Sequence, residues 1–102
     1  MSDTHTITSD EGTVTVTAGV LSQVVVTAVA GVDGARARRP RRGLDIDVDG
    51  SHARVRLELA VRYGEVLPDV AAAVQRSVLD ALREQCGLDA TSIDVSVEEL
   101  DA

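Results

Sequence analysis

The most constraining feature of the sequence is a pair of alternating segments that flank Asp49-Gly50. In residues 44–49 apolar side chains alternate with aspartates, and in residues 53–62 they alternate mainly with arginines. A two-residue period is typical of strands that bury one face. Because Asp-Gly between two such runs is a strong hairpin signal, these residues predict an antiparallel hairpin with one apolar and one charged face.

The register of this hairpin follows from the same alternation. A four-residue loop over residues 49–52 would align apolar with apolar and acidic with basic side chains, which stabilises both faces. The predicted pairs are Val48 with Ala53, Ile46 with Val55, Leu44 with Leu57, Asp47 with Arg54 and Asp45 with Arg56. A two-residue loop would keep the same faces and change the partners.

Two segments have helical spacing. The clearer one begins near Pro68, which suits the first turn of a helix, and ends near Gly87. Its apolar stripe consists of Val70, Val74, Val78 and Leu82, with Ala71 and Ala81 beside it.

In the other segment, Thr17 can cap the start of a helix and Gly31 can end it. Its apolar positions are Val20, Leu21, Val24, Val25, Ala28 and Val29. The β-branched run 24–26 favours a strand by propensity, so the residues alone leave both interpretations open.

Residues 13–16 and 93–97 alternate as two further strands. The order strand, helix, strand, strand, helix, strand predicts an α+β fold, a two-layer sandwich whose antiparallel sheet carries two helices on one face, with a ferredoxin-like topology. We expect residues 12–100 to form this single domain. Residues 1–11 read as a disordered N-terminal tail.

The charge-free run 13–32 has the length of a membrane span, and arginines follow it. Threonine, serine and glutamine interrupt this run, so we expect no transmembrane span. The start of the chain lacks the basic and apolar regions of a secretory signal. A lone cysteine fits a reducing compartment, and the expected location is therefore the cytoplasm.

Every basic residue of the chain is an arginine, and five of the ten lie in one loop, residues 35–43. These five are Arg36, Arg38, Arg39, Arg41 and Arg42. The other five stand against seventeen acidic residues, so an acidic body carries one basic loop. Such a run is commonly only solvated. Alternatively it docks on anionic lipid, on an RNA backbone or on the acidic surface of a second copy, and we favour the second copy because the chain supplies the opposite charge.

Arg54, Arg56, Glu58 and Arg62 project from the charged face of the predicted sheet. This face is either plain solvent surface or a docking surface for an acidic partner, and the residues alone leave both interpretations open. The net charge of −7 argues against duplex DNA as a partner, and the single aromatic residue, Tyr63, argues against stacking of RNA bases. Contacts to a nucleic-acid backbone need only arginines. A small RNA- or anionic-ligand-binding module is therefore the alternative to a protein interaction module.

The sequence predicts no catalytic site, no cofactor and no metal. Residues 45–50 match the first half of a calcium loop, but Arg56 stands where the bidentate glutamate is needed. His5, His52 and Cys86 have no paired ligand spacing, and no local signature marks Cys86 as a nucleophile. We therefore expect a protein that is not an enzyme.

A succession of short motifs is similar to a known family. In the second half these are Tyr63-Gly64, Val66-Leu67-Pro68, Val74-Gln75 in the helix, Cys86-Gly87-Leu88 and the strand 93–97. In the first half, residues 12–17 and the turn 31–34 are compatible with the same pattern. It resembles the alkaline shock protein family of envelope stress response proteins over most of residues 12–99. The arginine-rich loop falls in that family's variable stretch.

The resemblance implies a non-enzymatic cytoplasmic protein, peripheral on the inner face of a bacterial membrane through a small membrane-anchored partner, self-assembling and linked to cell-envelope homeostasis. It also favours a helix for residues 17–30, and it carries over no catalytic residue. We expect structural roles for the motif residues. These are Tyr63 as an aromatic plug at a strand end, Gly64 in a turn, Gln75 as a cap on a loop, and Gly87 at the helix end.

Overall fold

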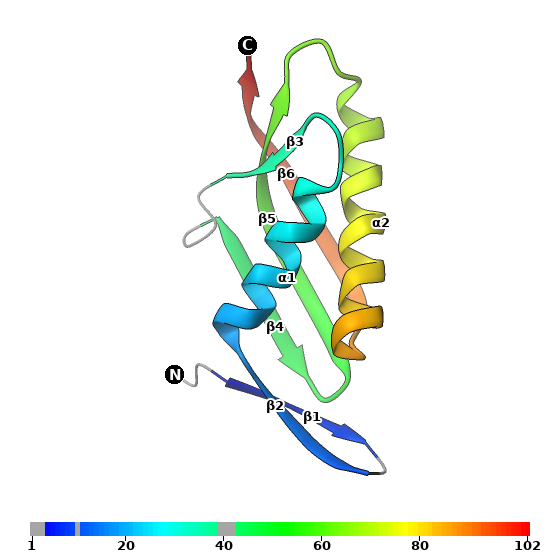
Figure 1. Ribbon diagram of the computed structural model, residues 1–102. Coiled ribbons are helices and arrows are strands. Elements are labelled where there is room, and N and C mark those ends of the chain that lie inside the picture. The colour runs from blue at the N-terminus through cyan, green and yellow to red at the C-terminus, as the bar shows by residue number, and fades with distance from the viewer. Residues whose placement is uncertain (1–3, 10, 39–42) are drawn as a thin grey trace.

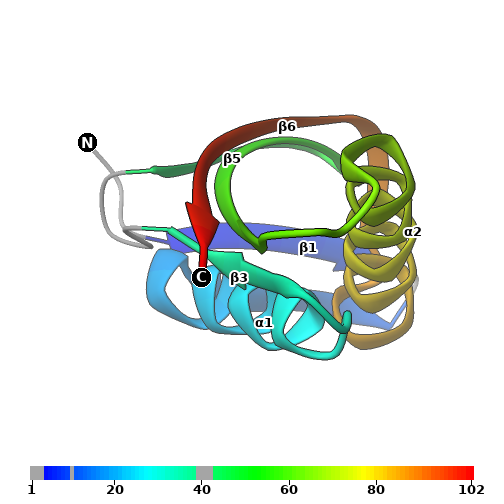
Figure 2. The same ribbon diagram turned by 90° about the horizontal axis from the view of Figure 1, so that it is seen from above.

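A computed structural model describes residues 4–9, 11–38 and 43–102, and it shows a sheet with two helices on one side (Figure 1). Helix α1 (Ala18–Ala30) and helix α2 (Leu67–Cys86) pack against each other and against the inner face of the sheet. Seen from above, β5 and β6 arch over one side of the molecule and α1 lies on the other (Figure 2). The predicted two-layer α+β fold is confirmed.

Strand β5 (His52–Arg62) is the centre of the sheet. Strand β4 (Leu44–Asp49) pairs antiparallel with its first half, and the short β3 (Ala35–Ala37) pairs antiparallel with its second half. Strand β6 (Asp89–Asp101) runs along β5 from end to end. Because β6 occupies one whole edge of β5, β3 and β4 follow each other along the opposite edge.

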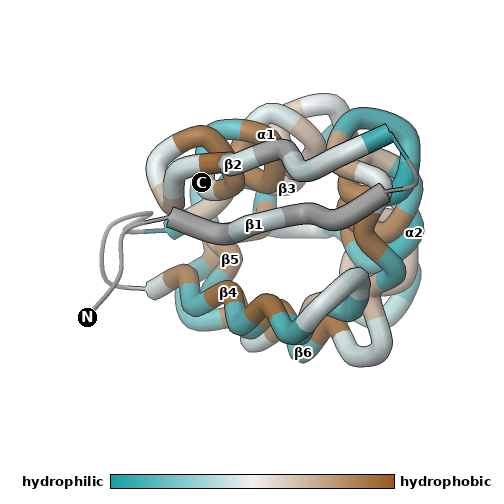
Figure 3. Tube along the Cα trace, turned by 90° about the horizontal axis from the view of Figure 1, so that it is seen from below, coloured by the Kyte–Doolittle hydropathy of each residue, from teal (hydrophilic) through white to brown (hydrophobic). Residues whose placement is uncertain are grey.

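The β4–β5 hairpin has the predicted register. Every expected pair is present, from Leu44 opposite Leu57 to Val48 opposite Ala53. The pairing extends one step further, which leaves a two-residue turn in which Gly50 has φ +63°, a conformation that glycine adopts without strain. The alternation is visible along β4, where the tube changes between hydrophilic and hydrophobic residues (Figure 3). The period of two was therefore sufficient to predict this hairpin.

The N-terminal strands differ from the prediction. Strand β2 (Gly12–Thr17) pairs with β1 (Thr4–Ser9), and these two form a separate sheet below the main one in Figure 1. The disordered tail predicted over residues 1–11 is wrong for β1, and the first predicted strand does not join the main sheet. The physical reason is competition: β6 already fills the edge of β5, while the β-branched residues of β2 pair with the preceding segment.

The direction of β6 is the second difference. The sequence predicts an antiparallel sheet, whereas β6 runs parallel to its neighbour β5. Helix α2 connects the two and carries the chain back along the inner face, so that both strands start from the same end. A strand–helix–strand crossover between adjacent strands produces a parallel pair.

Both helices lie where the sequence predicts. At the start of α1 the Thr17 Oγ1 accepts a hydrogen bond from the Val20 N–H at 3.2 Å, and the β-branched run 24–26 is helical. Helix α2 ends at Gly87, whose φ of +66° lies in the left-handed region. Glycine adopts this conformation at the end of a helix without strain. The helical side chains buried in the core are Leu21, Val25, Val29, Val70, Val74, Val78 and Leu82.

Two side-chain hydrogen bonds fasten α2 to its neighbours. The Gln75 Nε2 donates to the Ile93 carbonyl of β6 at 3.0 Å, and the Ser77 Oγ donates to the Ala28 carbonyl of α1 at 2.8 Å. Gln75 therefore ties the helix to a strand rather than capping a loop. Neither α1 nor α2, nor any other helix in the described ranges, is long and apolar enough to cross a membrane.

Candidate functional site

The outer face of the sheet, which the helices leave uncovered, holds the charged candidates. Alternate residues of β5 from Arg54 to Arg62 belong to this face. Strand pairing places Arg56 between Asp45 of β4 and Asp94 of β6. Central arginines are thus flanked by carboxylates of the neighbouring strands.

We call one half of this face the open end and define it by Asp45, Asp47, Arg54, Arg56 and Asp94. Among the residues that the structure describes, none of these five side chains forms an ion pair within 4.0 Å. Together with Ser92 they line a shallow hollow of about 540 Å³. Charges of both signs without internal partners can be satisfied by a charged partner from outside.

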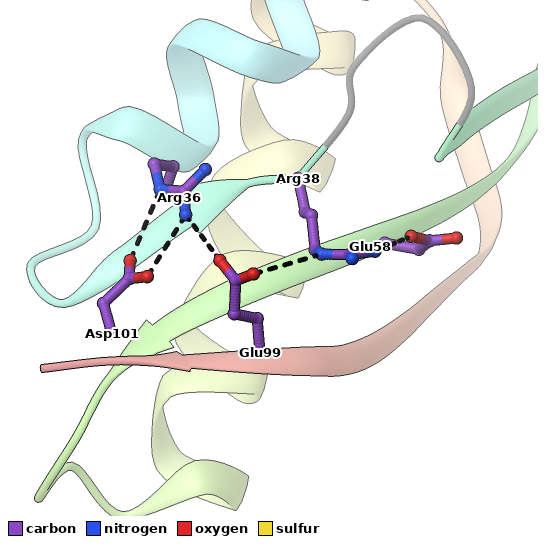
Figure 4. Close-up of polar contacts among 5 residues, drawn as sticks. All are labelled: Arg36, Arg38, Glu58, Glu99 and Asp101. Carbon is purple, nitrogen blue, oxygen red and sulfur yellow. Dashed lines mark hydrogen bonds and ion pairs between the residues drawn. The ribbon is translucent and has the colours of Figure 1, made fainter.

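The other half of the face, the paired end, consists of Arg36, Arg38, Glu58, Glu99 and Asp101 (Figure 4). The Arg36 Nη2 lies 2.9 Å from Glu99 Oε2 and 3.2 Å from Asp101 Oδ1. The Arg38 Nη1 lies 3.0 Å from Glu58 Oε1, and its Nε lies 3.8 Å from Glu99 Oε1. These charge-assisted contacts connect the β3 segment to both β5 and β6.

A small residue and an irregular pairing make the paired end possible. Ala60 lies opposite both Arg36 and Glu99, and it is fully buried although it is not part of the hydrophobic core cluster. Its methyl group leaves room for the guanidinium to reach across β5. The pairing of β6 skips Glu98 immediately after the Leu59 position, and this β-bulge places Glu99 on the outer face.

Hydrogen bonding holds two arginines firmly in the charged form. The bond to Asp101 is the main cause that raises the pKa of Arg36. The pKa of Arg62 is raised mainly by its hydrogen bond to Glu65 and next by that to Asp33. Since both guanidinium groups already have carboxylate partners, neither is well placed to bind an external anion.

The structure divides the predicted arginine candidates into three groups. Those bound to carboxylates of the same chain are Arg36, Arg38 and Arg62. Those that project from the outer face without an ion pair in the described chain are Arg54 and Arg56. Those that lie outside the described residues are Arg39, Arg41 and Arg42. Docking of the arginine-rich loop on a second copy stays a prediction.

Alternation alone does not reveal Glu99 and Asp101 as partners of the β3 segment. The residues after 97 read as an acidic tail, whereas β6 continues to Asp101. The one available signal is the break in period at Glu98-Glu99, where two acidic residues follow a regular alternation. Such a break is typical of a bulge.

The motif residues have clear positions. Tyr63 is 75% exposed, so it does not plug the end of β5 as predicted. Gly64 has φ +99° in the turn after β5, where only glycine is free of strain. Gly87 ends α2, and Gln75 binds β6.

The described residues offer little for catalysis or metal binding. Burial raises the pKa of the Cys86 thiol, which lowers its thiolate fraction at neutral pH. The His52 Nδ1 lies 3.8 Å from Asp89 Oδ2, and both side chains are exposed. In the described part of the chain no group of three or more His, Cys, Asp or Glu side chains could hold a metal ion.

Comparison with known proteins adds a family and a fold. Residues 35–102 match the model of the alkaline shock protein family, which is described as having a cell envelope-related function. No curated protein matches the chain.

Among solved structures, MamM-CTD 215-293 is similar with a TM-score of 0.63 and 19% identity over 80% of this chain and 98% of that chain. The copper form of a MamM CTD variant gives a TM-score of 0.64 and 18% identity over 83% and 99%. At such identities the likeness concerns the fold, and the ferredoxin-like arrangement predicted from the sequence is supported.

Proposed function

Because the chain belongs to the alkaline shock protein family, whose function is cell envelope-related, we propose that it is a non-enzymatic envelope stress response protein that associates with itself and peripherally with the cytoplasmic face of the membrane. In this proposal a small membrane-anchored protein holds it at the membrane. The chain acts by binding other proteins and changes no substrate.

The observation that supports self-association is the open end. Two arginines on the central strand are flanked by three aspartates on the outer strands, and these groups have no ion pair in the described chain. If a second copy packed its outer face on this face, shifted sideways by one strand, its aspartates would lie over these arginines. Complementary charges of this kind guide association and fix its register.

The free edges of the sheet favour contact through this face over edge pairing. The edge strand β4 carries Asp45, Asp47 and Asp49, and the edge strand β6 is acidic at both ends. Charged side chains on edge strands oppose the addition of a like-charged strand. Two copies therefore repel each other edge to edge, whereas the face presents both signs of charge.

Sedimentation of the full chain tests this surface. We expect an apparent mass above that of the monomer at low salt and a fall toward the monomer at high salt, because salt screens exposed charges. Replacing Arg54 and Arg56 by Ser should lower the mass at low salt. Arg76→Ser, on the exposed side of α2, is the matched control and should leave it unchanged. A mass that responds neither to salt nor to the double replacement contradicts self-association through this face.

Fractionation of the native host tests the membrane role. Membranes are isolated, and material that co-purifies with the protein is identified at low and high salt. A membrane-anchored protein partner agrees with the proposal. Nucleic acid that survives the high-salt wash would instead favour the RNA-binding alternative, and recovery of free monomer alone would contradict both.

A further inference from the structure

The exposed large apolar side chains are concentrated at one end of the molecule. Among the described residues five such side chains are exposed, and four of them belong to the β5–α2 connection, the start of α2 and the end of β6. These four, which we call the apolar patch, are Tyr63, Val66, Leu67 and Leu100. The fifth, Val20, is in the first turn of α1.

Backbone hydrogen bonds hold the apolar patch in one place. The Tyr63 N–H donates to the Asp101 carbonyl at 2.6 Å, which fixes the end of β5 beside the end of β6. The Val66 carbonyl accepts bonds from Asp69 and Val70 at 3.1 Å, which fixes the start of α2. These segments lie side by side at the top of Figure 1. The patch is therefore preformed, and little conformational entropy is lost when a partner binds it.

Packing within the chain does not explain these side chains. The hydrophobic core cluster and the residues packed against it include none of the four. Tyr63 is the only aromatic residue of the chain, and the fold leaves three quarters of it exposed. Buried aromatic residues stabilise a small core, whereas exposed tyrosines are enriched in binding hot spots.

The charges around the patch indicate what it binds. Arg62, the last residue of β5, is paired with Asp33 and Glu65, and Arg36 is paired with Asp101. Asp69 in the first turn of α2 adds a further carboxylate. Four acidic residues against two arginines leave the rim of the patch acidic. Two copies of this surface would oppose acid to acid, which disfavours a symmetric contact. The arginine-rich loop of a second copy supplies positive charge but no large apolar side chain.

We propose that the apolar patch is the docking surface for a segment of a partner protein in which large apolar side chains are interspersed with lysine or arginine. The apolar side chains of that segment cover Tyr63, Val66 and Leu67, and its basic side chains face the acidic rim. This inference rests on the proposed function, since it assigns the surface through which the membrane-anchored partner holds the chain. The open end remains for contacts between copies.

A peptide titration tests the surface with the full chain. The probe is a short synthetic peptide of leucine and lysine, compared with the same peptide carrying glutamate in place of lysine. In a ¹⁵N NMR titration we expect the basic peptide to shift the amides of the apolar patch and the acidic peptide to shift none. Shifts confined to the open end would overturn the assignment.

Matched variants make the test quantitative. The double variant Tyr63→Ser/Val66→Ser should bind the basic peptide about tenfold more weakly or worse, as expected for loss of hot-spot residues. Val20→Ser, at the other exposed apolar position, should bind as the unchanged chain does. All three proteins should have the same urea midpoint, because the substituted side chains are exposed. Equal affinities for the three proteins would refute the inference.

Fractionation of the host separates this inference from the proposed function. If the unchanged chain is at the membrane and the double variant is soluble, the result supports both this inference and the proposed function. If both chains are at the membrane, the patch is not the docking surface, although the proposed function holds. If the unchanged chain is not at the membrane, the proposed function fails, and the titration alone decides whether the patch binds a basic apolar segment.

Discussion

The open end and the paired end of the sheet have similar side chains and use them differently. Both combine arginines with carboxylates on adjacent strands, but ion pairs within the described residues form at the paired end only. At the paired end a buried alanine stands in the middle of the row, so an arginine on one side can reach carboxylates on the other. At the open end the arginines themselves occupy the central strand.

This difference teaches that alternation predicts the face of a side chain and not its partner. Arg36 meets Glu99 because Ala60 is small and because a bulge turns Glu99 outward. Both conditions depend on three strands at once. The paired end consequently stabilises the fold of a single chain, while the charges of the open end are available to another molecule.

Enlarging Ala60, which lies beneath the ion pairs of the paired end, should have the largest effect on the free energy of unfolding. Ala60→Leu would force a bulky side chain under the Arg36–Glu99 contact, and overpacking of this kind lowers the free energy of unfolding by about 1–3 kcal/mol. Urea denaturation measures the change. Arg56→Leu introduces the same residue on the same strand and face at the open end, where we expect a change within about 0.5 kcal/mol. Equal effects would mean that the two ends do not differ.

Removing Arg38, the half-buried arginine of the paired end, should have a smaller effect on the free energy of unfolding. The Arg38 side chain is 26% exposed and bound to Glu58, so Arg38→Ala should lower the free energy of unfolding by about 1 kcal/mol through loss of a charge-assisted hydrogen bond. Arg56→Ala is the control and should change the free energy little. A double-mutant cycle with Glu58→Ala isolates the pair. A coupling energy of zero would show that this pair contributes nothing to the paired end.

Raising the salt concentration should change the stability contribution of the paired end and the self-association through the open end. Arg36 is exposed, and raising sodium chloride from about 0.05 M to about 0.5 M screens its contacts. The difference in urea midpoint between the unchanged chain and Arg36→Ala should therefore shrink as salt rises. At the open end the same salt should leave the midpoint difference of Arg54→Ala unchanged and should weaken self-association instead. A salt-independent Arg36→Ala difference would contradict the electrostatic origin of the paired end.

The sequence predicted the elements whose signals are local. The β4–β5 register, the cap at Thr17 and the stop at Gly87 each follow from residues within one turn or one hairpin, and all are present. The outward position of Arg54 and Arg56 follows from the same period. These signals need no knowledge of the remainder of the chain.

The features that the sequence did not predict are non-local. Strand β3 has only three residues and depends on a free stretch of β5, and the parallel direction of β6 depends on the path of α2. The separate position of β2 follows from β6 occupying the edge. Exposure of Tyr63 is a tertiary property as well, since a tyrosine at a strand end reads equally well as a plug or as a surface residue.

We expect the smallest change in the free energy of unfolding when Glu98 is deleted. Removing one residue from a strand normally turns every later side chain to the opposite face. Glu98, however, is the residue that the pairing of β6 skips, so its deletion would restore regular alternation and keep Glu99 and Asp101 on the outer face. We expect the free energy of unfolding to change by about 0.5 kcal/mol or less, and the Arg36→Ala difference should persist in the shortened chain. Deleting Ser96, which is paired with Glu58, should instead turn Val97 outward and lower the urea midpoint sharply. If the two deletions are equally damaging, the bulge does not create the paired end, and its ion pairs must depend on another feature of β6.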